Sequence, residues 1–458
     1  MSRGQKKSVM NEKKTEAPFV TISRRGADRL RAGHVWVYRS DVIDAGATAP
    51  GALVIVREVG GPEHRKGSSD QTVRATRPLG TALYSSASEI ALRMVSTRPV
   101  ADLEDLVGER IRAAIAFRER FVQNTNAYRV IFSEGDFLPG LIVDRYNDIL
   151  SIQVLTQAMD SEKMRNVVVS ELTSALNPAA IAERVDARVR KLEQLPEKES
   201  GIVYVRELST KYAGPDSFVQ VGEPNSPSGV HDTGGRVRPP AYTQASSAAT
   251  EFEMNGIRFL YQALGTQKTG AFLDQRENYA ATAQYARGEA LDVFCYQGGF
   301  ALHLSRVCDK VTGVDSSRPA LEIADKNAAL NGREIDWVEA NAFDLLRDYS
   351  DTGRQYDAVV LDPPAFAKSK RDLATALRGY KELNLRALKM LRPGGILVTC
   401  SCSYHVSAFD LLQTLQSAAQ DSRRIIRILE NRGAAKDHPS VLGVPETAYL
   451  KCVILLVS

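Results

Sequence analysis

Short apolar runs and helix-like segments alternate through residues 290–420. A chain with this alternation forms a parallel sheet that is covered by helices on both faces. The runs expected as strands are residues 291–294, 310–315, 335–341, 356–362 and 394–403. The pattern therefore predicts an α/β fold of the doubly wound type for the C-terminal part of the chain, closed by a hairpin over residues 424–429 and 451–457.

The first of these strands runs into the glycine pair Gly298-Gly299. Two adjacent glycines allow a sharp turn and a close approach of the backbone to a ligand, and the helix expected from Phe300 would point free N–H groups at that ligand. Asp315 ends the second strand, where an acid can bind ribose hydroxyls. The G-x-G-x-x-G spacing of dinucleotide sites is absent, so nicotinamide chemistry is disfavoured.

Length and composition set further bounds. A chain of 458 residues is too long for one core, so two or three domains are expected. It has no run of 18 apolar residues, and no membrane span is predicted. Five cysteines within apolar segments favour reduced thiols in a cytoplasm over a disulfide framework. The net charge of +4 permits a polyanionic partner without requiring one.

Four motifs in order resemble the class I S-adenosylmethionine-dependent methyltransferases. They are the strand before Gly298-Gly299, then Val314-Asp-Ser316, Asp362-Pro-Pro-Ala-Phe366 and Thr399-Cys-Ser-Cys-Ser403. More narrowly, most of the chain resembles the bacterial 23S ribosomal RNA cytosine-C5 methyltransferases that carry an N-terminal PUA domain. The resemblance implies a Rossmann-like catalytic domain, a small β-rich PUA domain, an α+β linking domain and S-adenosylmethionine as cofactor.

Composition and resemblance together predict the domain organisation. A polar, charged surface loop is expected within the N-terminal domain, over residues 63–77. The expected parts are a disordered lysine-rich tail (1–17), a PUA-like RNA-binding domain (18–97), a central α+β domain (98–223), a flexible linker rich in Pro, Gly and Ser (224–250), and the methyltransferase domain (251–458).

The resemblance implies that the cofactor is held by the first loop and by the next two strand ends. The residues concerned are Asp292, Phe294, Tyr296, Gly298, Gly299, Asp315, Asn341 and Ala342. Such enzymes usually carry an acid at the position of Asn341, where it meets the adenine amino group. The carbonyl oxygen of Asn341 can accept the same hydrogen bond.

Cytosine methylation at carbon 5 requires a nucleophile. Carbon 5 reacts only after a thiolate adds to carbon 6, and the resemblance gives this role to Cys402 and ties Cys400 less closely to the motif. Cys400 and Cys402 would share one face while the strand continues. Asp362 would contact the unstacked base and Phe366 would stack on it. Some relatives carry a second cysteine in the loop of residues 362–366 and use it for product release. This chain has Ala365 in that loop, so another base must remove the carbon-5 proton, and Asp362 and a water are the candidates.

Basic residues are the candidates for RNA contacts. Arg24 and Arg25 of the PUA-like domain would contact phosphates, and Trp36 is either a stacking surface or a core residue. Lys268 and Arg276 would hold RNA phosphate or the cofactor carboxylate, with a salt-bridge or surface role as the alternative. The implied partner is 23S ribosomal RNA or a large-subunit assembly intermediate, with no membrane, and a homodimer is left open.

Two other functions stay open. A nitrogen methyltransferase acting on guanine or adenine fits the Asp-Pro-Pro-x-Phe loop, which resembles loops that receive an amino group. Nitrogen methylation does not need Cys402, so that residue discriminates between the two reactions. A non-catalytic RNA-binding or ribosome-assembly factor would bind no S-adenosylmethionine.

Overall fold

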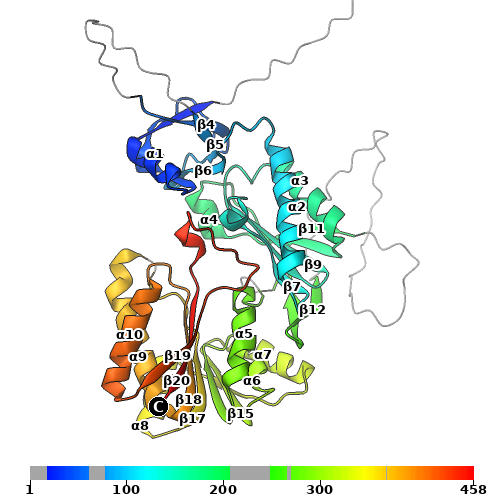
Figure 1. The fold of residues 1–458 in the computed structure, drawn as a ribbon. Helices are drawn as coiled ribbons and strands as arrows, with labels where there is room; N and C mark the ends of the chain where they lie inside the picture. The colour runs from blue at the N-terminus through cyan, green and yellow to red at the C-terminus, as the bar shows by residue number, and fades with distance from the viewer. Residues whose placement is uncertain (1–17, 61–77, 207–247, 266–269, 368) are drawn as a thin grey trace, which may run out of the picture.

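The computed structural model describes residues 18–60, 78–206, 248–265, 270–367 and 369–458. The predicted tail, the predicted surface loop, the linker up to residue 247 and the candidate residue Lys268 lie outside the described residues. The six-stranded, five-stranded and seven-stranded sheets follow one another from the top to the bottom of Figure 1, in chain order. No helix in the described ranges is long and apolar enough to cross a membrane.

The N-terminal sheet has six strands in the order β2-β6-β5-β4-β1-β3. Apolar side chains from alternate positions of these strands form its core, among them Val20, Ile22, Val54 and Val56. The helix α1 (Arg24–Arg31) follows β1 and begins at Ser23, whose hydroxyl accepts the N–H of Gly26. The strands are β1 (Phe19–Ile22), β2 (Trp36–Tyr38), β3 (Val42–Asp44), β4 (Leu53–Glu58), β5 (Pro78–Tyr84) and β6 (Ile90–Ser96).

The central sheet has five strands in the order β11-β10-β9-β8-β7. The long helices α2 (Leu103–Phe121) and α3 (Glu162–Leu176) share an apolar core with this sheet. The strand, turn and strand that the sequence predicts over residues 128–146 are confirmed as β7 and β8. The remaining elements are β7 (Ala127–Phe132), β8 (Leu141–Tyr146), β9 (Ile149–Val154), β10 (Ala180–Glu183), α4 (Ala187–Leu192) and β11 (Gly201–Val205).

A separate hairpin precedes the catalytic sheet. The sequence predicts one strand over residues 252–260, and this is wrong: β12 (Ala249–Met254) pairs antiparallel with β13 (Ile257–Gln262). Asn255 and Gly256 both have positive φ, the conformation that a two-residue hairpin turn requires. Since β12 begins at Ala249, the predicted linker ends two residues too late.

The C-terminal sheet has seven strands in the order β16-β15-β14-β17-β18-β20-β19. Its first five strands are parallel and β20 runs antiparallel between β18 and β19, which confirms the α/β fold class. The chain order reverses at β14, and ligands bind beside such a switch point. The strands are β14 (Glu289–Val293), β15 (Lys310–Asp315), β16 (Asp336–Glu339), β17 (Tyr356–Leu361), β18 (Leu391–Ser401), β19 (Ile426–Arg432) and β20 (Lys451–Val457).

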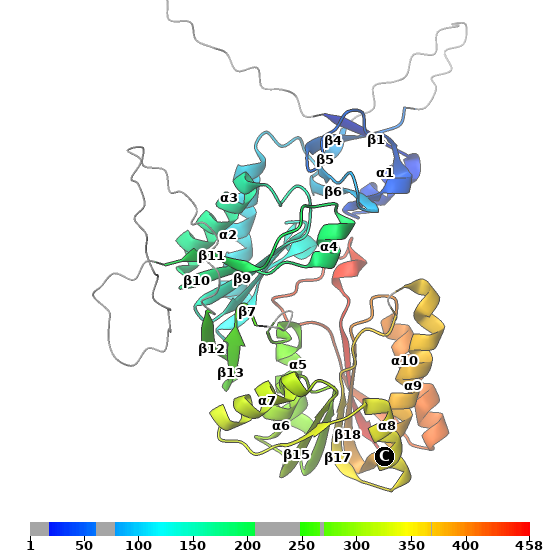
Figure 2. The same cartoon turned by 180° about the vertical axis from the view of Figure 1, so that it is seen from behind.

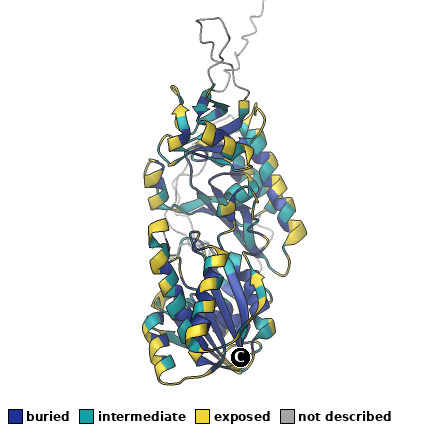
Figure 3. Ribbon diagram, turned by 60° about the vertical axis from the view of Figure 1, so that its left-hand side comes forward, coloured by how far each residue is buried: buried dark blue, intermediate teal, exposed yellow. Residues whose placement is uncertain are grey.

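Helices cover both faces of this sheet, each over its own apolar core (Figure 2). One face carries α5 (Arg276–Tyr285), α6 (Gly299–Leu304) and α7 (Arg318–Leu330); the other carries α8 (Ala342–Asp351), α9 (Leu373–Met390) and α10 (Ala408–Ser422). Figure 3 shows that burial concentrates in the strands and exposure on the outer helix faces. Ser317 caps α7, and its side chain accepts the N–H of Ala320.

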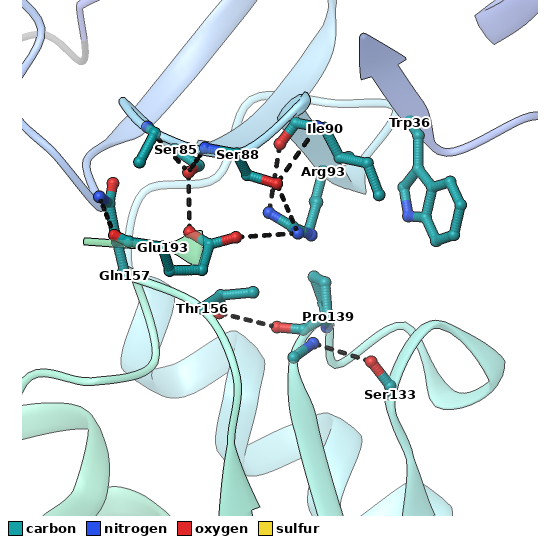
Figure 4. A network of polar contacts seen from close by, with 12 residues as sticks. Trp36, Ser85, Ser88, Ile90, Arg93, Ser133, Pro139, Thr156, Gln157 and Glu193 are labelled. Atoms are coloured by element: carbon teal, nitrogen blue, oxygen red, sulfur yellow. Dashed lines mark hydrogen bonds and ion pairs between the residues drawn. The ribbon is translucent and has the colours of Figure 1, made fainter. Parts of the chain in front are cut away.

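Polar side chains join the N-terminal sheet to the central one (Figure 4). Glu193 accepts hydrogen bonds from Ser85 Oγ at 2.7 Å and from Arg93 Nη2 at 3.1 Å. Trp36 is half-buried at this junction and donates from Nε1 to Glu134 of the central body at 3.1 Å. The sequence leaves Trp36 as either a core residue or a stacking surface, and neither alternative includes this hydrogen bond to Glu134.

Candidate active site

The carboxyl ends of β17 and β18 bring the predicted nucleophile and the predicted acid together. The two strands are parallel neighbours, so the loops that follow them meet at one edge of the sheet. Asp362-Pro363 follows β17 and Cys402 follows β18, and Cys402 Sγ lies 3.8 Å from the Pro363 carbonyl oxygen. Asp362 N also donates to the Val293 carbonyl at 3.2 Å, which places this loop beside the end of β14.

The two cysteines of the motif differ in environment. Cys400 is fully buried in β18, directly opposite Cys452 of β20. Cys402 is partly exposed, because β18 ends at Ser401 and the chain leaves the sheet there. The strand alternation that would place Cys400 and Cys402 on one face therefore ends before Cys402.

Acidic groups dominate the electrostatics around Cys402. Burial, followed by the carboxylates of Asp362 and Asp274, raises the pKa of the Cys402 thiol to about 11, while Lys451 acts in the opposite direction. Burial and Asp274 also raise the pKa of Asp362 to about 7, against a hydrogen bond of 3.0 Å from Gln275 Nε2. Asp362 therefore changes charge near neutral pH, as a proton acceptor in a catalytic site must.

The loop between β14 and α6 has a strained backbone. Phe294, Tyr296 and Gly298 have φ values of 68°, 50° and 86°, and the first two lie in a region that non-glycine residues seldom occupy. Asp315 holds this loop: its Oδ2 accepts the N–H of Tyr296 at 3.0 Å, and its Oδ1 accepts the N–H of Ser317 at 2.8 Å. The predicted ribose-binding acid therefore also shapes the loop.

The two adjacent positions 298 and 299 require glycine for different reasons. Gly298 adopts the left-handed conformation that precedes α6, which favours glycine. A Cβ on Gly299 would lie 2.5 Å from the ring of Tyr279, so this position lacks a side chain because Tyr279 packs against it. The close approach at Gly299 is thus to a side chain of the protein.

The residues of this loop fit S-adenosylmethionine. Phe272 and Asp362 line a cavity together with residues of this loop. Asp292 is fully buried and its Oδ2 accepts the N–H of Ala301 at 2.8 Å, but Oδ1 has no hydrogen-bond partner among the described residues. A buried carboxylate oxygen without a partner suits a ligand with amino or hydroxyl donors.

Asn341 and Ala342 begin α8. The side-chain oxygen of Asn341 accepts the N–H of Phe343 at 2.9 Å and so caps the helix, a common use of asparagine. Ala342 is buried at the first position of the helix. The same oxygen also accepts the N–H of Asp344 at 3.4 Å, so the atom expected to meet adenine serves as the helix cap.

The side chain of Arg276 lies in a buried ion pair with Asp437. Its side chain is 1% exposed and donates to both carboxylate oxygens of Asp437, at 2.9 and 3.1 Å. Against the effect of burial, His438 and Arg276 hold the pKa of Asp437 well below its ordinary value. Arg118 of α2 donates to the Asp437 carbonyl at 2.7 Å. The Arg276–Asp437 pair of the C-terminal domain therefore contacts the domain of the central sheet. This is the salt-bridge alternative.

Aromatic residues support the nucleophile loop. Tyr380 of α9 is fully buried, and its hydroxyl lies 2.9 Å from Ser401 Oγ and 3.1 Å from Ser403 Oγ, the residues on either side of Cys402. Phe366 packs its ring against Tyr380, with 4.9 Å between ring centroids. Asn384 donates to the Tyr380 carbonyl at 2.8 Å.

Four residues near Cys402 and Asp362 were not expected from the sequence: Asp274, Gln275, Tyr449 and Lys451. Asp274 accepts a hydrogen bond from Tyr449, and Lys451 opens β20. Asp274 and Gln275 fall within the block at residues 267–276 that resembles the family, which was the one signal for them. No motif marks Tyr449 or Lys451.

The predicted phosphate contacts of the N-terminal sheet are paired with acids. Arg25 donates to Asp41 at 2.7 Å, although its side chain remains 67% exposed. Arg24 is 86% exposed and lies 3.8 Å from Glu58. Arg24 is thus the freer of the two for a phosphate.

Comparisons with known proteins agree with this architecture. Residues 243–453 match the S-adenosylmethionine-dependent methyltransferase family, and residues 20–61 match the PUA-like domain. A relative from Photobacterium profundum, named ribosomal RNA large subunit methyltransferase I, is 32% identical over 92% of this chain and 95% of its own. The protein of that name from Aeromonas hydrophila is 34% identical over 82% of this chain and 87% of its own.

Solved structures show the same fold. A methyltransferase in complex with SAH has a TM-score of 0.72 at 16% identity, covering 96% of this chain and 100% of its own. A SAM-dependent methyltransferase from Streptococcus mutans has a TM-score of 0.71 at 15% identity, with the same coverage of both chains. The sequence relatives establish more than the fold: this chain is an S-adenosylmethionine-dependent methyltransferase and belongs to the ribosomal RNA large subunit methyltransferase I family.

Proposed function

We propose that the protein transfers a methyl group to carbon 5 of a cytosine in large-subunit (23S) ribosomal RNA, through a covalent adduct with Cys402. The position of Cys402 carries the proposal: its partly exposed thiol lies against the Asp362-Pro363 loop, which adjoins the end of β14. The names of the curated relatives support ribosomal RNA as the substrate. A ribosomal RNA substrate in turn supports action in the cytoplasm, on naked RNA or on an assembling subunit.

We assign Cys402 and Asp362 to successive steps of this reaction. Bound S-adenosylmethionine supplies an electrophilic methyl group. The Cys402 thiolate forms a bond to carbon 6, and the electron pair of the carbon 5–carbon 6 double bond becomes available at carbon 5. Carbon 5 takes the methyl group as the bond between that group and the cofactor sulfur breaks, and the electron pair of the broken bond stays on the sulfur. Asp362 then accepts the carbon-5 proton, the double bond re-forms, and the carbon–sulfur bond breaks to release the thiolate.

Nucleoside analysis tests the reaction. Ribosomal RNA lacking large-subunit modifications is incubated with the protein and S-adenosylmethionine, digested and examined by mass spectrometry. We expect 5-methylcytidine. Methylated guanosine or adenosine without 5-methylcytidine would establish nitrogen methylation, the alternative that needs no Cys402. No methylated nucleoside and no S-adenosylmethionine binding would favour a non-catalytic RNA-binding factor.

The N-terminal sheet is proposed to bind the RNA, with Arg24 and Arg25 as phosphate contacts. The PUA-like match and the exposure of both side chains support this role. A homodimer is left open, and sedimentation of the purified protein at several concentrations measures the oligomeric state.

Asp315→Ala is expected to weaken S-adenosylmethionine binding by about 1–3 kcal/mol, because the ligand loses an acceptor and the loop at Tyr296 loses its anchor. Calorimetric titration measures the affinity. Asp336→Ala is a suitable control, since Asp336 is an exposed acid at the start of β16 that pairs with Lys310. Unchanged affinity in a folded Asp315→Ala variant would show that Asp315 contributes nothing to the cofactor site.

A further inference from the structure

The nucleophile stands among groups that oppose its ionisation. Asp362 and Asp274 present carboxylates to Cys402, and the phenols of Tyr380 and Tyr449 are electrostatically coupled to its thiol. None of these four side chains can stabilise a negative sulfur by its charge. Since the thiolate and not the thiol attacks carbon 6, the site needs a compensating positive charge.

Lys451 is placed to supply that charge. It opens β20 and lies directly opposite Ser401 in the antiparallel pair with β18. Its Nζ donates to the Ser403 carbonyl oxygen at 2.7 Å. The ammonium is therefore fixed against the backbone of the residue that follows Cys402.

Among the residues that the structure describes, Lys451 also lacks a carboxylate partner. Within the described ranges no ion pair joins it to an acid within 4.0 Å, whereas Lys310 pairs with Asp336 at 3.0 Å and Lys381 with Asp421 at 2.7 Å. The acid of α10 that influences it, Asp410, acts at longer range and bonds instead to Ser407. Burial lowers the pKa of Lys451 to about 8, and the charge of Cys402 raises it. An ammonium that is partly buried and unpaired gains from a nearby anion.

We propose that Lys451 is a positioning residue that holds the Cys402 thiolate as its counter-ion. This role rests on the proposed function, in which Cys402 attacks carbon 6. The thiol gives its proton to a solvent base, the sulfur keeps the electron pair, and the Lys451 ammonium stabilises that charge until the sulfur–carbon bond forms. When the bond between the Cys402 sulfur and carbon 6 breaks after methyl transfer, the Lys451 ammonium stabilises the released thiolate.

Alkylation of Cys402 by iodoacetamide tests this role without RNA or cofactor. The rate is followed from about pH 6 to pH 10 in the full-length protein, and peptide mass spectrometry separates Cys402 from the other cysteines. Lys451→Met is expected to slow alkylation about tenfold near pH 7, as a rise of one unit in the thiol pKa would, and the difference should shrink above about pH 8, where Lys451 loses its own proton. Unfolding would instead expose Cys402 and speed its alkylation.

Two further variants separate charge from hydrogen bonding. Lys451→Arg keeps the charge and should restore the alkylation rate to within about threefold. Lys451→Gln keeps a donor for the Ser403 carbonyl but not the charge, so it should behave like Lys451→Met. Lys310→Met removes a lysine that also opens a strand, at the opposite end of the sheet, and should react like the wild type.

The contrary outcomes are distinct. A wild-type alkylation profile in Lys451→Met, or rescue by Lys451→Gln, would overturn the counter-ion role and leave Lys451 as a structural donor. The proposed function fails separately, if Cys402→Ala remains active on RNA while the alkylation results hold.

Discussion

Cys402→Ala is expected to lower methyl transfer by roughly 10⁴-fold or more, because removing a covalent nucleophile removes the step that activates carbon 5. RNA that carries 5-fluorocytosine at the target should trap a covalent complex with the wild-type protein, since fluorine cannot leave as a proton does. The complex should form only with S-adenosylmethionine present, and Cys402→Ala should form none. Denaturing gels measure the adduct and a tritiated methyl group measures the turnover.

Cys400→Ala is the matched control. Cys400 is fully buried against Cys452, so the substitution removes a small packed side chain at a cost of about 1 kcal/mol and should keep both adduct and activity. The opposite pattern, with Cys400 essential and Cys402 dispensable, would move the nucleophile into the sheet interior. Full activity in the double variant would end the cysteine mechanism and revive nitrogen methylation.

Much of the catalytic fold could be predicted because its signals are local. The expected parallel strands are short apolar runs, most of them followed by a recognisable sequence motif. Ser317, followed by a helical pattern, marks the start of α7. The hairpin β12–β13 was missed because its residues alternate without interruption, and only Asn255-Gly256 signals the turn. A pattern of period two does not by itself separate one long strand from two short ones.

The parts of the site that were not predicted depend on contacts between distant segments. Arg276 and Asp437 are 161 positions apart, so the sequence could not show that they form a buried pair. Lys451 comes near Cys402 because β20 pairs antiparallel with β18, a register that no motif encodes. Asn341 was expected at the cofactor because of the family resemblance, which does not show that its side chain also caps α8.

Asp362→Asn is expected to lower turnover by about 10²–10⁴-fold, the range for loss of a general base, and to accumulate covalent adduct on ordinary cytosine-containing RNA. Asparagine has nearly the same shape but cannot accept the carbon-5 proton, so the reaction stops after methyl transfer. Attack by Cys402 should persist, because removing a carboxylate that raises the pKa of the thiol favours the thiolate. Adduct formation is scored on denaturing gels with unmodified RNA.

The pH dependence of release gives a second test of the same residue. Asp362 has a pKa of about 7 in the folded chain and must be ionised to act as a base, so the rate of adduct release should rise through about pH 7 and then level off. Because the pKa of Asp362 is higher in the folded than in the unfolded chain, the unfolded carboxyl loses its proton at lower pH. This group therefore lowers the free energy of unfolding as pH rises from about 4 to about 7. The Asp362→Asn variant should not show this decrease. Asp344→Asn changes an exposed acid of α8 and should leave adduct release unaltered. If Asp362→Asn yields neither adduct nor methylated RNA, the carboxylate acts before methyl transfer, and a water must take the carbon-5 proton instead.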